Sequence, residues 1–413
     1  MRILHTSDWH LGHTLHDLPR EHEHRSFLAW LLGTIEARQV DALLVAGDVF
    51  DTANPSAAAQ AIWYRFVAEA RRRFPALDIV VIGGNHDSAD RLDAPAPLFV
   101  GFDVRVVGGL PRGASRALEV ERLLVPLRDG RGEVAAWVAA VPFLRPADLL
   151  PREGADDPLI EGVRAVYAEV LEAARARREP EQAIVAMGHC YMVKGEISEL
   201  SERRILGGNQ HALPLDIFPE DVAYAALGHL HRPQRVGREN VRYSGSPLPL
   251  SMAEIDYRHQ VCLVELEGEK LGSIEEIPVP RAVELLRVPK TGTLPPEELL
   301  AALKKLPKRG EEADHELPFL EVRTRLEAPE PGLRARVEAA LAGRAARLVR
   351  LGVELSGDGR SLAEQVVDRM LDELKPGEVF ANCYRKRYEG APPPDLLAAF
   401  DELLDAVHQE KSR

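Results

Sequence analysis

Cysteine is scarce in this chain, which has three among its 413 residues. Cys190, Cys262 and Cys383 are odd in number, and none of them belongs to a C-x-x-C pair. Disulfide-stapled domains and zinc ribbons need cysteines in even, closely spaced sets, so the sequence argues against both classes. The pattern is typical of a protein of the reducing cytoplasm.

Long apolar runs are also missing, although 45% of the residues are hydrophobic. No run approaches the roughly 20 apolar residues that span a bilayer. The residues directly after Met1 already have the composition of a strand, which leaves no room for a secretory leader. We therefore expect a soluble cytoplasmic protein without a membrane partner, long enough for two or three domains.

The phosphate-binding loop of ATPases, G-x-x-x-x-G-K-[ST], is absent from the sequence. Any ATP dependence would therefore have to come from a partner subunit. An excess of positive charge is absent as well, because 52 Lys and Arg stand against 65 Asp and Glu and give a net charge of −13.

What the chain does contain is a series of short blocks of His, Asp and Asn, each at the end of a short apolar run. The five blocks are Asp8-Trp9-His10, Gly47–Asp51, Gly84–Asp87, Gly188-His189 and Gly228–His231. The runs before them are rich in β-branched residues, which predicts buried strands. Loops after the carboxyl ends of strands in α/β folds converge on one crevice, so these side chains can meet around an ion.

The residue types in the blocks favour particular metals. Carboxylates together with imidazoles suit Mn²⁺, Fe²⁺ or Zn²⁺, and Mn²⁺ is our first choice. Two such ions about 3.5–4 Å apart can activate water and stabilise the charge of a phosphoryl group. One carboxylate has to bridge them, and Asp48 is the best candidate because it lies between the Asp8/His10 pair and the later histidines.

The order D-x-H, G-D-x-x-D, G-N-H-D, G-H and G-H-x-H is similar to that of the calcineurin-like metallophosphoesterase superfamily. Five longer segments narrow the likeness to the bacterial SbcD nucleases: Arg2–Gly12, Val45–Thr52, Gly84–Ser88, Ala226–Arg232 and Tyr243–Ser251. This resemblance covers nearly the whole chain.

The resemblance implies two metal sites that share one ligand. The first would consist of Asp8, His10, Asp48 and His231, and the second of Asp48, Asn85, His189 and His229. His86 would not be a ligand but would face the scissile phosphate, where an imidazolium stabilises charge or protonates the leaving oxygen. Asp51 and Asp87 are candidates for fixing imidazole orientation, with turn capping an equal alternative for both. Archaeal members of the family carry a His in place of Asp51, which leaves its duty open.

Strand and helix patterns alternate to about Val264, and a further strand is predicted over Leu271–Val279. Residues 281–355 then show a strand–helix–strand–helix–strand rhythm. Helical periodicity returns over Leu362–Leu374 and Leu396–Val407. By their sequence alone, these two helices either dock on a partner protein or pack back on the first domain.

The fold class that we expect is α/β. A calcineurin-like phosphoesterase sandwich would occupy residues 1–280, a small α/β capping domain 281–355 and a C-terminal helical arm 356–413. The resemblance implies that the cap lies over the active-site cleft and that the arm binds the SbcC ATPase subunit. It also implies a homodimer within a heterotetramer.

The function that the resemblance implies is that of a dimetal-dependent DNA nuclease. It would act as an exonuclease on duplex ends and as an endonuclease at hairpins or blocked ends, with SbcC, in DNA repair and recombination. The net charge weakens this interpretation without refuting it, because two divalent ions add about four positive charges to the cleft. A phosphatase of the same fold and a non-catalytic scaffold that tethers DNA ends are the alternatives.

Overall fold

A computed structural model of the chain describes residues 1–150, 157–193, 212–328 and 330–355, together with positions 384, 393 and 396. Met1–Thr324 and Pro331–Val353 form one compact unit. Apart from the three single positions, the arm predicted over 356–413 lies outside the described residues, and so do its two helices.

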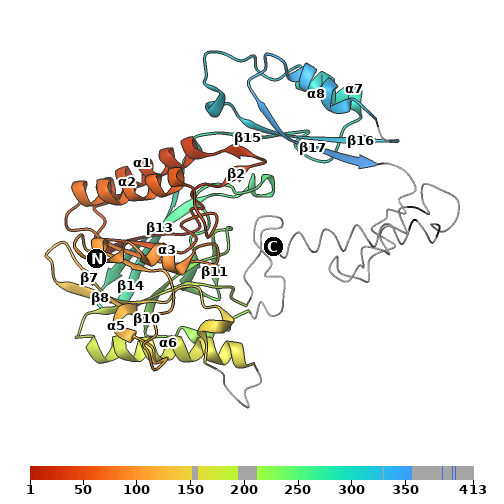
Figure 1. Cartoon of the computed structure of the whole chain (residues 1–413). Helices are drawn as coiled ribbons and strands as arrows, with labels where there is room; N and C mark the ends of the chain where they lie inside the picture. Colours follow the sequence, from red (N-terminus) through yellow and green to blue (C-terminus); the bar gives the residue numbers. More distant parts are fainter. Residues whose placement is uncertain are drawn as a thin grey trace. The chain divides into compact units, whose positions relative to one another are not determined.

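Two six-stranded sheets form the centre of this unit (Figure 1). In the first sheet the order is β14-β13-β1-β4-β5-β6. Its parallel strands are β1 (Arg2–Thr6), β4 (Ala42–Ala46), β5 (Asp78–Ile82) and β6 (Val104–Val107). The antiparallel hairpin of β13 (Gln260–Glu267) and β14 (Lys270–Pro278) joins it beside β1.

The second sheet has the order β11-β12-β10-β9-β8-β7. Its four central strands are parallel: β12 (Arg238–Tyr243), β10 (Val222–Gly228), β9 (Ala183–His189) and β8 (Val134–Ala140). The edge strands β11 (Gln234–Val236) and β7 (Leu124–Arg128) are antiparallel to their neighbours. Thr14–Leu15 (β2) and Leu18–Pro19 (β3) form a separate small hairpin.

Helices cover the outer faces of the two sheets (Figure 1). On the first sheet lie α1 (Glu21–Arg38) and α2 (Ala57–Arg73), and on the second lies α6 (Pro158–Arg177). The short helices are α3 (Ala89–Asp93), α4 (Ala96–Val100) and α5 (Val120–Leu123). None of the helices in the described part of the chain is long and apolar enough to cross a bilayer.

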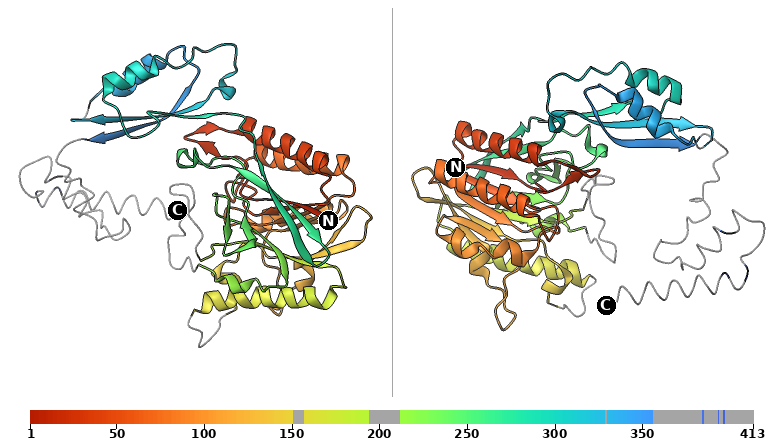
Figure 2. Two further views of the ribbon diagram at one scale, coloured as in Figure 1. Left: turned by 180° about the vertical axis from the view of Figure 1, so that it is seen from behind. Right: turned by 45° about the horizontal axis from the view of Figure 1, so that its top comes forward.

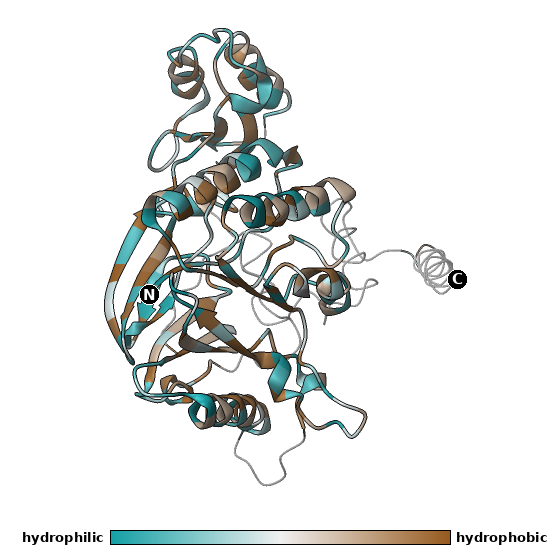
Figure 3. Ribbon diagram, turned by 90° about the vertical axis from the view of Figure 1, so that its left-hand side faces the viewer, coloured by the Kyte–Doolittle hydropathy of each residue, from teal (hydrophilic) through white to brown (hydrophobic). Residues whose placement is uncertain are grey.

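The period-two alternation of strand side chains produces this layering. In the first sheet Ile3, Leu44 and Val80 pack toward the second sheet, whereas Leu4 and Val45 pack against α1 and α2. The strands are therefore apolar on both faces, and Figure 3 shows hydrophobic residues concentrated along them. The predicted α/β phosphoesterase sandwich is confirmed as four layers: helix, sheet, sheet and helix.

A three-stranded sheet with the order β15-β16-β17 follows the sandwich in sequence. Its elements are β15 (Leu285–Val288), α7 (Pro296–Leu303), β16 (Phe319–Leu326), α8 (Leu333–Leu341) and β17 (Arg347–Leu355). The predicted strand–helix–strand–helix–strand pattern is thus present, and α7 and α8 lie together on one face of the sheet (Figure 2).

Candidate metal centre

The histidine and aspartate blocks lie at the carboxyl ends of strands from both sheets. Asp8 and His10 follow β1, Asp48 follows β4, and Asn85 and His86 follow β5. His189 ends β9, and His229 and His231 follow β10. Because β1, β4 and β5 are parallel in the first sheet and β9 and β10 in the second, the carboxyl ends in each set face the same side, and the two sets of loops meet there.

Three groups of residues define this candidate metal centre, and within each group the potential ligand atoms lie within 4.8 Å of one another. They are Asp8, His10 and His231; His10, Asp48 and His86; and Asp8, Asp48 and His189. The Asn85 Oδ1 atom joins the last group, 3.0 Å from His189 Nε2 and 2.9 Å from His229 Nδ1. The structure therefore brings together all seven predicted ligands and His86.

Asp48 has the position that a shared ligand needs. Its Oδ2 atom is 3.6 Å from His10 Nε2 and 3.4 Å from His189 Nε2, so one oxygen lies between imidazoles of the two predicted sites. Its Oδ1 atom accepts a hydrogen bond from the backbone N–H of His86 at 2.8 Å. The second oxygen thus fixes the carboxylate while the first points into the centre.

Hydrogen bonds at Nδ1 fix the orientation of three histidine rings. His189 Nδ1 lies 2.9 Å from the carbonyl oxygen of Ala46, His10 Nδ1 3.1 Å from Asp51 Oδ1, and His231 Nδ1 3.0 Å from Glu254 Oε1. Carbonyl and carboxylate oxygens accept, so Nδ1 donates in each case. In this tautomer Nε2 is the nitrogen that can bind a metal, which is the usual arrangement of ligating histidines.

The donor set fits divalent ions. The His10 Nε2 atom is buried and has no hydrogen-bond partner among the described residues, although it lies close to the Asp48 carboxylate. A ring nitrogen in that condition is costly to bury unless something binds it. Imidazole nitrogens, carboxylate oxygens and an amide oxygen are also ligands that Mn²⁺, Fe²⁺ and Zn²⁺ share.

Without metal, the charges of the centre are strongly coupled. Burial disfavours the carboxylate of Asp48, yet the charge and hydrogen bond of His189 outweigh it and hold the pKa well below its usual value. Burial opposes protonation of His189 too, but Asp48 raises its pKa to about 9. Burial, with the neighbouring charge of His189, lowers the pKa of His229 to about 3. A proton on His189 therefore occupies the place that a cation would take.

The backbone of the ligand loops is unusual. Asp8, His10, Asp48 and His229 have positive φ angles of 53°, 45°, 50° and 101°. Residues other than glycine rarely adopt this region, and strained backbone of this kind clusters at functional sites. Gly84 permits the crowding, because a Cβ atom there would lie 2.1 Å from Asp48 Oδ1.

His86 lies beside the centre, with its ring 4.6 Å from that of His10 between centroids. Its Nδ1 atom is 2.8 Å from the backbone oxygen of Asp51, so Nδ1 donates and any acid–base chemistry falls to Nε2. The side chain is only 8% exposed. His86 is therefore held beside the predicted ligands with its Nδ1 already engaged.

The two aspartates proposed to orient imidazoles behave differently. Asp51 does contact a ring, that of His10. Asp87 instead accepts hydrogen bonds from the backbone N–H groups of Val49, Phe50 and Gly84 at 3.1, 2.9 and 2.9 Å. These contacts of Asp87 are those of the turn-capping alternative, and through them its carboxylate ties the loop after β5 to the loop after β4.

Sequence reasoning missed Glu254, the buried carboxylate that orients His231. It also missed Ser7, whose hydroxyl donates to Asp8 Oδ2 at 2.6 Å. Glu254 belongs to no His- or Asp-rich block, so the only available signal was its position soon after the Tyr243–Ser251 segment.

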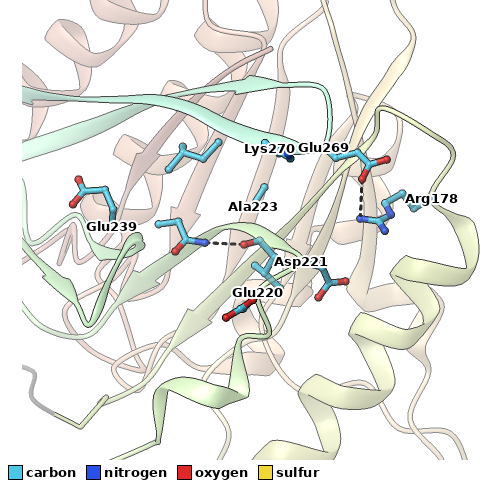
Figure 4. Close-up of a pocket in the computed structure, with 10 residues that line it drawn as sticks. Arg178, Glu220, Asp221, Ala223, Glu239, Glu269 and Lys270 are labelled. Carbon is cyan, nitrogen blue, oxygen red and sulfur yellow. Dashed lines mark hydrogen bonds and ion pairs between the residues drawn. The ribbon is translucent and has the colours of Figure 1, made fainter.

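A pocket of about 430 Å³ lies at the opposite edge of the second sheet, where β10 begins (Figure 4). Its lining is rich in carboxylates, from Glu220, Asp221, Glu239 and Glu269. Arg178 pairs with Glu269 at 3.9 Å, and Asn240 donates to the backbone oxygen of Val222 at 2.8 Å. Because these carboxylates would repel a phosphodiester, the pocket does not compete with the metal centre as the place of the chemistry.

Comparison with known proteins agrees with the geometry. Residues 1–233 match the family described as Calcineurin-like phosphoesterase, and residues 281–388 match the one described as Type 5 capsule protein repressor C-terminal domain. A protein of Rhodobacter capsulatus, named as the D subunit of the nuclease SbcCD, is 44% identical over 391 residues, which are 93% of this chain and 94% of that protein.

Two other proteins with the same name are also similar. The one from Escherichia coli K12 is 38% identical over 288 residues, covering 68% of each chain. The one from Bacillus subtilis is 34% identical over 284 residues, covering 67% of this chain and 69% of its own. The chain therefore belongs to the calcineurin-like phosphoesterase family and, within it, to the D subunits of the SbcCD nucleases.

Proposed function

We propose that this chain is a two-metal nuclease that hydrolyses phosphodiester bonds of DNA. The observation that carries the proposal is the convergence of all seven predicted ligands on one buried centre, with the Asp48 oxygen between His10 and His189. Mn²⁺ is the proposed metal, because the mixture of imidazole and oxygen ligands suits it. The proposed actions are exonucleolytic on duplex ends and endonucleolytic at hairpins or blocked ends.

The roles of the residues follow from their positions. Asp8, His10, Asp48 and His231 would hold one ion, and Asp48, Asn85, His189 and His229 the other. When bound, the two ions supply an activated water and neutralise charge on the phosphoryl oxygens. His86, whose Nδ1 is held by the backbone oxygen of Asp51, would use Nε2 to stabilise or protonate the leaving oxygen.

The partners that we propose are an SbcC-type ATPase and double-stranded or hairpin DNA. The name of the relatives, as one subunit of SbcCD, supports a partner subunit. Because the sequence has no phosphate-binding loop, the ATPase activity in this proposal belongs to that partner. The proposed docking segment is 356–413, and the proposed assembly contains two copies of this chain. A chromosomal DNA substrate would place the protein in the cytoplasm, at the nucleoid.

The deciding experiment measures cleavage of end-labelled duplex and hairpin DNA with Mn²⁺, with and without the SbcC-type partner and ATP. The wild type is compared with His86→Ala and with His16→Ala, an exposed histidine that serves as control. We expect Mn²⁺-dependent cutting by the wild type and the control. His86→Ala should lose about 10²–10⁴-fold in rate, the usual contribution of general acid catalysis.

The two alternatives predict other results. A phosphatase of the same fold would hydrolyse a small phosphomonoester and leave DNA intact under every condition. A scaffold that only tethers DNA ends would bind DNA and the partner without cleavage, and His86→Ala would change none of its activities. Retention of all seven ligands argues against the scaffold, since a protein without chemistry has no need of them.

A second experiment tests the docking segment. Removal of the residues after 355 should leave binding of two Mn²⁺ ions intact and abolish co-purification with the SbcC-type partner. Co-purification of the truncated chain would refute the assignment of this segment.

A further inference from the structure

The loop that connects β12 to β13, residues 244–259, contains a buried carboxylate beside the metal centre. Glu254 is fully buried, and its Oε1 atom accepts the hydrogen bond from Nδ1 of His231 at 3.0 Å. Its Oε2 atom accepts from the backbone N–H of Leu250 at 2.7 Å. Glu254 thus has one oxygen on a predicted metal ligand and the other on its own loop.

The path of this loop determines where the carboxylate stands. A shift of the loop backbone moves Glu254, and the imidazole of His231 has to follow or lose its partner. Carboxylates that hold the far nitrogen of a ligating histidine fix its orientation and raise its basicity, and their loss typically costs 10–100-fold in metal affinity. Whatever holds the loop in place therefore acts on the metal centre.

Three arginines hold the loop through its backbone oxygens. The Arg20 side chain, which is buried at the start of α1, donates from Nη1 to Pro249. Arg287 Nη2, on β15, donates to Met252 at 2.5 Å. Arg281 Nη2 donates to Ile255 at 2.5 Å and to Tyr257 at 3.2 Å. Two of the three belong to the segment after residue 280, outside the sandwich.

Two of these three arginines, Arg20 and Arg287, also contact buried side chains outside the loop, which fixes the positions of their guanidinium groups. Arg20 pairs with the buried Glu23, and its guanidinium lies 5.8 Å from the ring centroid of Phe319 on β16. Arg287 Nε pairs at 2.6 Å with Glu321, which is 1% exposed.

Apolar contacts also join this loop to the three-stranded sheet. Leu15, Met252, Val283, Leu285 and Phe319 form one buried cluster, and Ile255 packs against it. Met252 and Ile255 come from the loop, whereas Leu285 and Phe319 come from the three-stranded sheet. The loop is thus part of the core beneath that sheet.

We propose that these three arginines, with the apolar cluster, form a clamp by which the segment after residue 280 positions Glu254 and, through it, His231. Arg20, Arg281 and Arg287 are positioning residues in this proposal, because they act on the metal through another side chain. The proposal rests on the two-metal function proposed above and deepens it. A movement of the three-stranded sheet would change the affinity for the ion held by His231 and leave unchanged the affinity for the ion held by Asn85, His189 and His229.

The test compares two arginines that bind the same carboxylate. Arg287 and Arg323 both pair with Glu321, at 2.6 and 3.0 Å, but only Arg287 also holds the loop. Arg287→Ala and the matched control Arg323→Ala are titrated with Mn²⁺ in the full-length chain, by calorimetry and by electron paramagnetic resonance. Glu254→Gln is measured in parallel, because it removes the negative charge that faces Nδ1 of His231.

We expect Glu254→Gln to lower the affinity for one of the two Mn²⁺ ions by about 10–100-fold and to leave the affinity for the other unchanged. Arg287→Ala should lower the affinity for the same ion by about tenfold, since Arg287 acts on it only through the loop and Glu254. Arg323→Ala should bind both ions as the wild type does, and Arg287→Lys should recover most of the affinity because an ammonium can still donate to Met252. If Arg287→Ala does not fold, Arg281→Ala takes its place.

Unchanged affinity for both ions in Arg287→Ala, alongside a loss in Glu254→Gln, would overturn the clamp. Equal weakening by Arg287→Ala and Arg323→Ala would also overturn it, since the effect would then be general destabilisation. The Mn²⁺ titrations need no DNA and therefore test the clamp separately from the nuclease. A wild type that binds two ions but cleaves no DNA would refute the nuclease proposal. The Mn²⁺ affinities of the variants would still decide whether the clamp exists.

Discussion

Ionisable side chains lie at both ends of strand β10, but those at one end are partly exposed and those at the other are buried. At its amino end Asp221 pairs with Arg175 at 2.7 Å, and each side chain is about one-third exposed, at 33% and 32%. At its carboxyl end His229 and His231 lie almost fully buried beside other ionisable groups. Water solvates the charges at the first end, whereas at the second end only protein groups or an ion can satisfy them.

The pKa values express this difference. The hydrogen bond from Arg175 lowers the pKa of Asp221, as in an ordinary surface pair. At the other end, burial and the charge of His189 lower the pKa of His229 to about 3, whereas on the neighbouring strand β9 burial opposes protonation of His189 but Asp48 raises its pKa to about 9. Neighbouring buried histidines whose pKa values are shifted in opposite directions are typical of a functional site.

The largest effect is expected when the shared ligand is removed. Asp48→Ala should abolish binding of both Mn²⁺ ions, because the carboxylate belongs to both sites. Asp221→Ala, at the other end of the sheet, should still bind two. Calorimetric titration measures both variants, and two ions bound to Asp48→Ala with unchanged affinity would show that Asp48 is not shared.

A smaller loss is expected when the shared ligand is displaced but kept. A Cβ atom at Gly84 would lie 2.1 Å from Asp48 Oδ1 and 2.3 Å from the Asp48 backbone nitrogen, so Gly84→Ala has to push the loop after β4 away. We expect Mn²⁺ affinity to fall by about 10–100-fold, as for other changes that misplace ligands. Gly33→Ala is the control, because a Cβ atom there has no neighbour within 4 Å.

Gly33 lies inside α1, so its replacement by alanine should leave both metal affinities unchanged and stabilise the protein by about 0.5–1 kcal/mol. Wild-type affinity in Gly84→Ala, measured by the same titration, would mean that the loop adapts without moving Asp48.

A pH dependence sharpens the contrast between the two ends. Without metal, His189 has a pKa of about 9, so at pH 7 to 8 an incoming ion has to displace its proton. Between these pH values the apparent affinity for Mn²⁺ should rise about tenfold per unit, and the rise should stop near the pKa of His189. Calorimetry in buffers of different ionisation enthalpy counts the released proton; no release at about pH 7.5 would contradict the protonated state.

The smallest effect belongs to the amino end. Asp221→Ala removes a partly exposed ion pair with Arg175, which should cost no more than about 1 kcal/mol of the free energy of unfolding. Urea denaturation of the metal-free protein measures it. A loss of several kcal/mol would show that the pair is coupled to the core and that the two ends differ less than their exposure indicates.

The sequence by itself determined the strands and the positions of the predicted ligands at their ends, for a local reason. Apolar, β-branched runs form buried strands wherever they stand, and a polar block after such a run lies at the strand's carboxyl end. The amino-acid pattern alone could therefore place Asp8, Asp48, Asn85 and His189 in one crevice. The small α/β domain was visible in the same way, because its elements alternate with regular spacing.

Only the tertiary structure decided which groups support those ligands. Glu254 reaches His231, and Asp87 caps the loop after β4, through contacts between loops far apart in sequence. The arginines that hold the Glu254 loop come from α1 and from the segment after residue 280, and nothing local distinguishes them from other arginines of the chain. Periodicity reports how a segment is buried, but the partner of a buried polar atom depends on how the segments pack, so the packing alone assigned these roles.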